Sequence, residues 1–253
     1  MLNAFSVTVL AGLSTGLGGL VVLLSRRPGA RMMAFSLGFA AGVMLTVSLS
    51  DMLPHTVKIY AVALPPVRAA LAAGSLCALG MAAALLLGRL VPEPRPQAAV
   101  TQRNANALRS AMITTLALVM HNLPEGVLTL FTGVADPGIG TPLALAIALH
   151  NIPEGIAVAV PVYYATGSRA RGFFYALASG LAEPLGALLA FCLFARLLSP
   201  LFLNGLIAGI AGIMLFVSVS ELLPESFSYG KRMHAIAGAC IGMLVMHVGI
   251  YLV

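Results

Sequence analysis

The chain alternates long apolar runs with short polar connectors, and this pattern predicts eight membrane-spanning helices. A helix needs about 20 apolar residues to cross the hydrocarbon core of a bilayer. Runs of about that length lie at roughly 4–25, 32–54, 67–91, 108–133, 142–165, 172–197, 202–223 and 232–252. We therefore predict an all-α polytopic membrane protein with one transmembrane domain over residues 1–253. A linker rich in Pro, Arg and Asn is expected at 92–107.

Similarity between distant spans predicts an inverted repeat. Residues 40–54 align without gaps on residues 210–224, and nine of the fifteen positions are identical. The two segments lie in spans two and seven, so they cross the membrane in opposite directions. A weaker similarity relates residues 12–20 of span one to residues 180–188 of span six. We expect a 3+2+3 architecture, in which spans 1–3 are related to 6–8 and span four to span five, as in many transporters.

Composition and charge agree with a membrane protein. Hydrophobic residues make up 60% of the chain and charged residues 9%, whereas a soluble domain has about 25% charged residues. The net charge of +6 does not indicate nucleic acid as a partner, because the basic residues gather in connectors after spans one, three, five and seven. By the positive-inside rule these connectors face the cytoplasm and both termini lie outside. We therefore expect a multi-pass protein of the cell inner (cytoplasmic) membrane, with the lipid bilayer as its surroundings.

Two copies of an unusual polar motif interrupt spans four and five. HNLPEG occupies residues 121–126 and HNIPEG occupies residues 150–155. In each copy the His and the Glu are four residues apart, so they share one helix face. Because the two spans are antiparallel neighbours, we expect both faces to meet at one seam. The candidate metal-ligating residues in the motifs are His121, Asn122, Glu125, His150, Asn151 and Glu154.

Glu183 in span six adds a third intramembrane carboxylate. Charged groups at this depth are costly and mark functional sites, and no Lys or Arg is available to pair with these carboxylates. A bound divalent cation, or protonation, would compensate them. Imidazole nitrogen with carboxylate and amide oxygen suits Zn²⁺, Fe²⁺, Mn²⁺ and Co²⁺, whereas thiolates would select Cu⁺. A single motif would be consistent with a proline kink, but two copies on facing spans favour a metal site.

The chain resembles the ZIP (Zrt/Irt-like protein) family of divalent metal transporters, and within it the bacterial ZupT-like branch. The resemblance covers essentially the whole chain and rests on the doubled motif, on FSLGFAAGVML at 35–45 and on SGLAEPLG at 179–186. It implies uptake of zinc, and also of iron, manganese, cobalt and cadmium, by alternating access. It further implies a homodimer without enzyme activity, for which the metal is the transported substrate and not a cofactor.

The resemblance also implies a binuclear site at mid-membrane. The first position would be formed by His121, Glu125, His150 and Glu154, with Met44 near it. The second position would be formed by Asn122, Asn151 and Glu183, with Glu125 and Glu154 bridging the two ions. Spans 1, 4, 5 and 6 would move against spans 2, 3, 7 and 8 in an elevator-like motion. The 92–107 linker lacks the histidine-rich stretch of many family members, which argues against cytoplasmic metal sensing there.

Polar residues near the span ends suggest an entrance and an exit. Asp51 and His55 lie at the outer end of span two and could collect ions from outside. Glu221, Glu225 and His234 lie around the inner end of span seven and could receive them. Ordinary interfacial roles for these five residues remain the alternative.

Two other functions are open to such a sequence. An intramembrane metal-dependent hydrolase would use a His and carboxylate site to activate water, but no HExxH motif and no spare general base are present. A proton-coupled transporter of an organic solute would use the carboxylates as a relay, but aromatic residues, typical of solute pockets, make up only 7% of the chain. No GxxxxGK[ST] motif indicates ATP hydrolysis.

Overall fold

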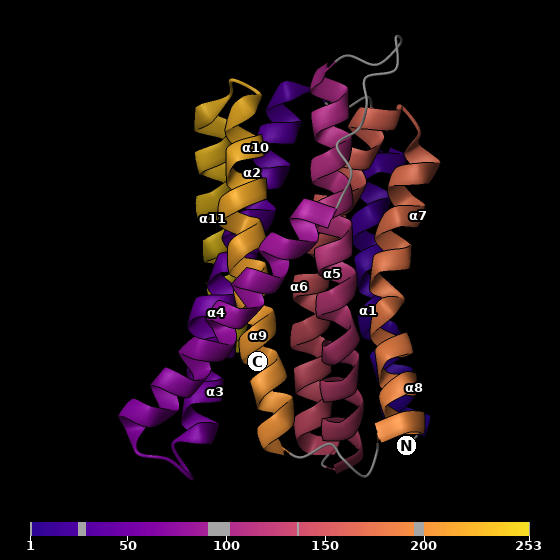
Figure 1. Cartoon of the computed structure of the whole chain (residues 1–253). Helices are drawn as coiled ribbons and strands as arrows, with labels where there is room; N and C mark the ends of the chain where they lie inside the picture. Colours follow the sequence, from indigo (N-terminus) through magenta and orange to yellow (C-terminus); the bar gives the residue numbers. More distant parts are fainter. Residues whose placement is uncertain (1, 25–28, 91–101, 136, 195–199, 253) are drawn as a thin grey trace.

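The structure, a computed structural model, describes residues 2–24, 29–90, 102–135, 137–194 and 200–252 (Figure 1). Residues 92–101 of the expected linker lie outside the described residues. Every regular element in the described ranges is helical. The elements are α1 (Leu2–Leu24), α2 (Ala30–Thr46), η1 (Val47–Met52), α3 (Leu53–Tyr60), α4 (Pro66–Leu90), α5 (Gln102–Ala135), α6 (Pro137–Thr166), α7 (Arg169–Gly180), α8 (Ala182–Phe194), α9 (Pro200–Val217), η2 (Ser218–Leu222), α10 (Leu223–Ser228) and α11 (Arg232–Leu252).

These elements join into eight passes through the bundle, which confirms the all-α architecture. The combinations α2–η1–α3, α7–α8 and α9–η2–α10 each form one pass, and the remaining five helices form one each. Within the described residues, six passes are long and apolar enough to cross a membrane. The other two, α5 and α6, carry the polar motifs and contain 34 and 30 residues. At about 1.5 Å per residue, both exceed the thickness of the hydrocarbon core.

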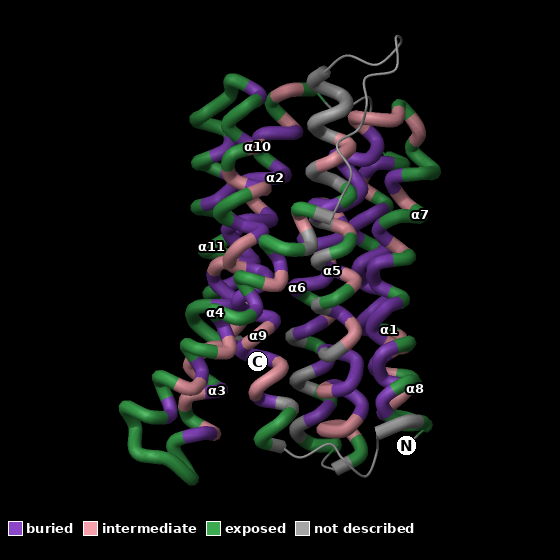
Figure 2. The backbone as a smooth tube through the Cα atoms, in the orientation of Figure 1, coloured by how far each residue is buried: buried purple, intermediate pink, exposed green. Residues whose placement is uncertain are grey.

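The helices pack in two groups (Figure 1). In one group α1, α5, α6 and α7–α8 pack on one another, and in the other α2 packs on α11 and α4 on α9. Buried residues follow the inner sides of both groups (Figure 2). The main apolar core, which includes Leu37, Met44, Val158 and Met214, draws residues from both groups. The motif helices α5 and α6 therefore lie where the two groups meet.

The inverted repeat is visible in the backbones that touch. A Cβ added at Gly155 of α6 would collide with the carbonyl oxygen of Thr15 in α1. A Cβ added at Gly126 of α5 would collide with the carbonyl oxygen of Glu183 in α8. Gly126 and Gly155 each end a motif, and Thr15 and Glu183 are equivalent in the similarity between 12–20 and 180–188. The same contact therefore occurs once in each half, as the 3+2+3 architecture requires.

A second pair of equivalent features is a π-helical turn in spans two and seven. η1 and η2 occupy corresponding parts of the similar segments 40–54 and 210–224, and a Leu-Pro pair follows each. π-helical turns are rare in proteins, and those that occur are often found at functional sites. The equivalent residues Gly12 and Gly180 also contact each other's carbonyl oxygens, as expected of positions at a pseudo-two-fold axis.

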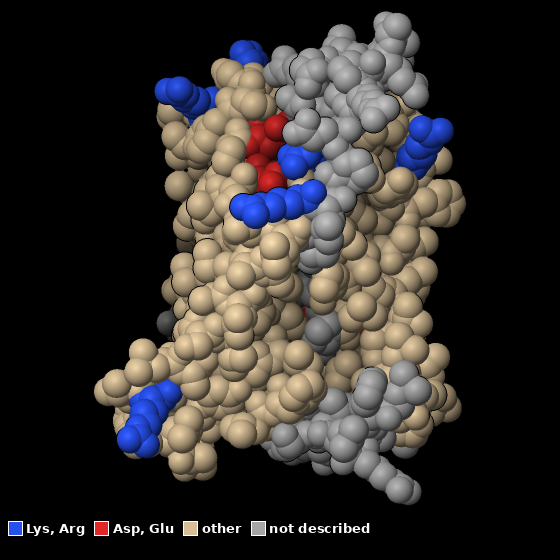
Figure 3. Space-filling view, in the orientation of Figure 1, with Lys and Arg blue, Asp and Glu red and all other residues tan. Residues whose placement is uncertain are grey.

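On the face shown in Figure 3, the charged side chains lie mainly toward the two ends of the bundle and the surface between them is mostly uncharged. Exposed apolar side chains include those of Leu10, Leu71 and Leu244. This distribution suits a surface that faces lipid in the middle and water at both ends.

Candidate metal site

The first part of the site is a carboxylate and an imidazole contributed by the two motifs. Glu125 Oε1 on α5 lies 3.1 Å from His150 Nε2 on α6, and each side chain is 7% exposed. Glu154 follows His150 by one helical turn on α6 and is buried. The side chain of His121 lies outside the described residues. The structure thus brings one candidate ligand of each motif to the common seam.

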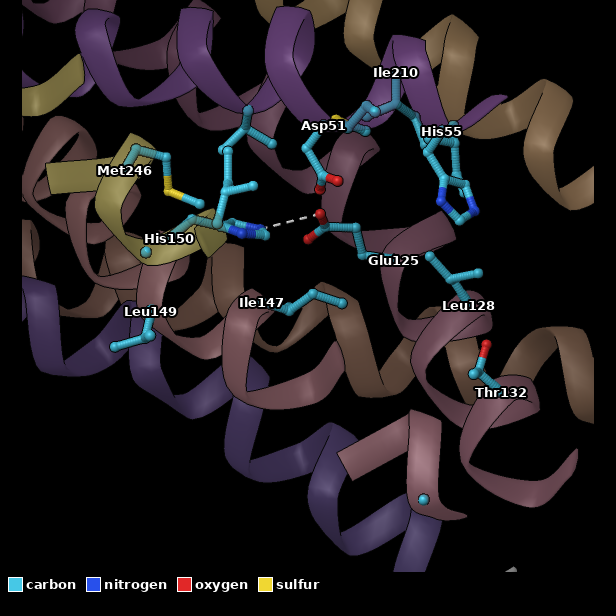
Figure 4. Close-up of a pocket in the computed structure, with 16 residues that line it drawn as sticks. Asp51, His55, Glu125, Leu128, Thr132, Ile147, Leu149, His150, Ile210 and Met246 are labelled. Carbon is cyan, nitrogen blue, oxygen red and sulfur yellow. Dashed lines mark hydrogen bonds and ion pairs between the residues drawn. The ribbon is translucent and has the colours of Figure 1, made fainter. Parts of the chain in front are cut away.

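A cavity of about 540 Å³ reaches this pair (Figure 4). Asp51 of η1 and His55 of α3 line it together with Glu125 and His150. In Figure 4 the Asp51 carboxylate points toward the Glu125 and His150 pair. The cavity extends to Gly138 at the start of α6, so it leads toward the end of the bundle where α5 and α6 connect. The two residues expected at the entrance therefore share one cavity with the pair.

The second part of the site is a set of buried amides and a carboxylate. Asn151 Nδ2 donates hydrogen bonds to Glu183 Oε2 at 2.9 Å and to the carbonyl oxygen of Ala11 at 3.0 Å. Asn122 Nδ2 donates to the carbonyl oxygen of Ser179 at 2.9 Å. Within the described chain, Oδ1 of both asparagines and Oε1 of Glu183 have no hydrogen-bond partner. Buried oxygens without a partner are uncommon and costly, and a cation would satisfy them.

The described side chains do not by themselves surround an ion. Among them, no group of three or more His, Cys, Asp or Glu side chains is placed to hold a metal ion. The donors form two pairs instead, Glu125 with His150 and Asn151 with Glu183. The cysteines Cys77, Cys192 and Cys240 are free thiols.

The expected Met44 is not among the residues that line this cavity. Met44 is buried in the apolar core, and the thioethers at the cavity wall are those of Met52 and Met246. Met246 belongs to α11 and directly precedes His247, and neither residue was predicted from the sequence as part of the site. Thr15 and Ser179 were also not predicted from the sequence. Their hydroxyls are fully buried next to the second part of the site.

The expected exit residues lie around the connection between α10 and α11. Glu221 in η2 and Glu225 in α10 are half-buried, and His234 near the start of α11 is exposed. Glu221 and Glu225 are equivalent in the repeat to Asp51 and His55, since each pair is 170 positions apart. The two residues expected at the entrance and two of the three expected at the exit therefore occupy corresponding positions of the two halves.

Comparison with known proteins assigns the family. Residues 92–249 match the family described as ZIP Zinc transporter. A protein of Corynebacterium aurimucosum named "Zinc transporter ZupT" is 44% identical over 98% of this chain and 96% of its own length. Proteins of the same name from Streptococcus mutans and Stenotrophomonas maltophilia are 38% and 40% identical, over 100% and 98% of this chain and 98% and 95% of their own lengths.

The doubled motif, the eight helical passes and the relatives agree on one family. Its members are transporters, so the expectation that the chain is not an enzyme is confirmed and the hydrolase interpretation is set aside. This chain belongs to the ZIP zinc transporter family of multi-pass membrane proteins, alongside bacterial ZupT relatives.

Proposed function

We propose that the protein takes up divalent transition-metal ions across the cytoplasmic membrane, with zinc as its main substrate. The observation that carries this proposal is the buried pair of Glu125 and His150 at a cavity between two antiparallel motif helices. Imidazole with carboxylate suits zinc, and also iron, manganese and cobalt, and cadmium is included on family resemblance. The names of the relatives, which are zinc transporters, support zinc as the first choice.

The proposed path begins in the cavity. An ion enters beside Asp51 and His55 and passes to Glu125 and His150, which line the same cavity. A second ion is held beside Asn122, Asn151 and Glu183, with the carboxylates of Glu125 and Glu154 shared between the two positions and His121 completing the first. These carboxylates replace the water that the ions lose. A membrane potential, negative inside, contributes about 2.3 kcal/mol per 100 mV for each charge that the carboxylates do not compensate, and together with the metal gradient it drives entry without ATP.

Alternating access follows from the two helix groups. We propose that α1, α5, α6 and α7–α8 move together against α2, α4, α9 and α11, so that the site is exposed in turn to the cavity and to Glu221, Glu225 and His234. In the described chain, each close glycine contact with the backbone of another helix falls within one group. Gly155 with Thr15 and Gly42 with Ala239 are examples. Close backbone packing makes the first group rigid, and in the second group it makes rigid the pairs α2 with α11 and α4 with α9. None of these glycine contacts crosses the boundary between the groups, which we propose is where sliding occurs.

Transport is tested with purified protein in liposomes that contain a zinc-sensitive dye. The wild-type protein should show influx under an imposed zinc gradient, and Glu125→Gln should abolish it. Iron, manganese, cobalt and cadmium are then tested as competitors. Absence of zinc influx by the wild-type protein, at every pH and potential tried, would defeat the proposal.

The proposed orientation is tested with single cysteines in a variant whose native cysteines are replaced. Ala63 lies in the exposed connection between α3 and α4, and Lys231 in the exposed connection between α10 and α11. An impermeant maleimide should label Ala63→Cys, and not Lys231→Cys, in intact cells. The reverse pattern would place both termini inside. Cross-linking in membranes tests the homodimer, for which a purely monomeric product would count against the proposal.

A further inference from the structure

A buried hydroxyl in one half of the fold occupies the position of a carboxylate in the other half. Thr15 in α1 and Glu183 in α8 are equivalent in the repeat, and their carbonyl oxygens make equivalent contacts with Gly155 and Gly126. Both side chains are fully buried. Equivalent positions therefore carry a hydroxyl in the first half of the fold and a carboxylate in the second.

The hydrogen bonds around this position follow the same symmetry. Asn151 donates to the carbonyl oxygen of Ala11, and Asn122 donates to that of Ser179. Ala11 precedes Thr15 by four residues, and Ser179 is its equivalent in the other half. Each motif asparagine is thus held by the same bond at the pseudo-two-fold axis.

The bond between Asn151 and Glu183 indicates where the Thr15 hydroxyl lies. Transferred through the repeat, that bond becomes a juxtaposition of Asn122 and Thr15. A direct contact agrees with this, since a Cβ added at Gly180 would lie 2.8 Å from Thr15 Oγ1. Gly180 directly follows Ser179, whose carbonyl oxygen accepts the hydrogen bond from Asn122. The Thr15 hydroxyl therefore borders the second part of the site from the α1 side.

Among the described residues, five buried side-chain oxygens near the pseudo-two-fold axis have no hydrogen-bond partner. Within the described part of the chain no hydrogen bond is made by Thr15 Oγ1, Asn122 Oδ1, Asn151 Oδ1, Ser179 Oγ or Glu183 Oε1. Amide and carboxylate oxygens only accept hydrogen bonds, unless the carboxylate is protonated. The two hydroxyls can donate one hydrogen each, so oxygen lone pairs still outnumber hydrogens in this set, and a cation binds such lone pairs. Because every atom here that could bind a metal ion is oxygen, this position suits harder cations than the Glu125 and His150 pair, which contains an imidazole nitrogen.

We propose that Thr15 is a specificity-determining residue whose hydroxyl donates an oxygen ligand to a cation beside Asn122, Asn151 and Glu183. The inference rests on the proposed transport function and deepens it. A neutral hydroxyl in place of a second carboxylate limits the negative charge around the ion. It also completes an oxygen-only environment, which favours Mn²⁺ relative to Zn²⁺. Removal of the hydroxyl should therefore weaken Mn²⁺ more than Zn²⁺.

The test compares Thr15→Val, which keeps the shape without the hydroxyl, with Thr15→Ser, which keeps the hydroxyl. Thr8→Val is the matched control, because Thr8 is also fully buried on α1 but its Oγ1 already donates to the carbonyl oxygen of Ala4 at 3.0 Å. Zinc uptake into liposomes is measured with increasing Mn²⁺ as competitor. Thr15→Val should raise the Mn²⁺ concentration for half-inhibition about fivefold, the size of one lost ligand bond. Thr15→Ser and Thr8→Val should stay within about twofold of wild type.

A half-inhibition value for Thr15→Val within about twofold of wild type, with normal zinc uptake, overturns the role of Thr15 and leaves the transport function intact. An equal increase for Thr8→Val also overturns it, since the effect would then be one of α1 packing. If Thr15→Val does not elute as a single species, Thr15→Ala, which is smaller, is judged by the same criterion. Absence of zinc uptake by the wild-type protein overturns the proposed function instead.

Discussion

Gly155→Ala is expected to loosen the packing of α1 on α6. The added Cβ would meet the carbonyl oxygen of Thr15, and would lie 3.1 Å from the Cα of Gly18. Both obstacles belong to the backbone, so relief requires the two helices to separate. Overpacking of this kind costs about 1–3 kcal/mol, and the better helix propensity of Ala returns up to about 1 kcal/mol. With the full propensity gain returned, the net loss is up to about 2 kcal/mol, which corresponds to a midpoint lower by up to about 8 °C for a chain of this length.

The assay is size-exclusion elution of detergent-solubilised protein after heating, followed by the fluorescence of a fused reporter. Gly74→Ala in α4 is the matched control, since an added Cβ there would meet nothing within 4 Å. That variant should gain about 0.5–1 kcal/mol. Gly126→Ala, the repeat equivalent of Gly155→Ala, should lose stability in the same direction. A midpoint for Gly155→Ala at or above that of wild type would refute the reasoning from backbone contact.

Further expectations concern the site. Glu125→Gln removes the carboxylate from the buried pair, so purified protein should retain less zinc by elemental analysis, and unchanged metal content would contradict the proposed ligand role. Asp51→Asn combined with His55→Gln should raise the apparent KM for zinc more than it lowers the maximal rate, because both residues line the cavity; an unchanged KM would return them to ordinary interfacial roles. Asn122→Ala leaves a buried carbonyl oxygen without its donor and should cost about 1–3 kcal/mol, and an unchanged thermal midpoint would show that this bond contributes nothing.

The eight passes and the repeat could be predicted because they depend on properties that are local in the sequence. Apolar length determines whether a helix can span a bilayer, and the similarity of 40–54 to 210–224 is visible without any structure. The proximity of Glu125 and His150 followed from the antiparallel order of two adjacent spans. Each of these inferences needs only spacing along the chain.

The remaining features depend on how helices are rotated and placed against one another. Met44 and Met246 both lie in apolar helices, and only the packing shows that Met246 lines the cavity and Met44 does not. Thr15 and Ser179 are common residues in apolar helices, so neither indicates a site. The sequence similarity of 12–20 to 180–188 pairs Thr15 with Glu183, and only the contacts between distant helices show that both residues lie beside the motif glycines.

The π-helical turns also carry information about ancestry. A π turn contains one residue more than the α-helical turn that it replaces, and it rotates everything beyond it by about 100°. Such a turn arises most simply by insertion of a single residue. Because η1 and η2 occur at corresponding places in the two halves, one insertion in a single three-helix ancestor, before its gene was duplicated, explains both. Asp51 and Glu221, acidic residues within these turns, would then descend from one ancestral acid that served opposite faces of the membrane in a dimer of identical halves.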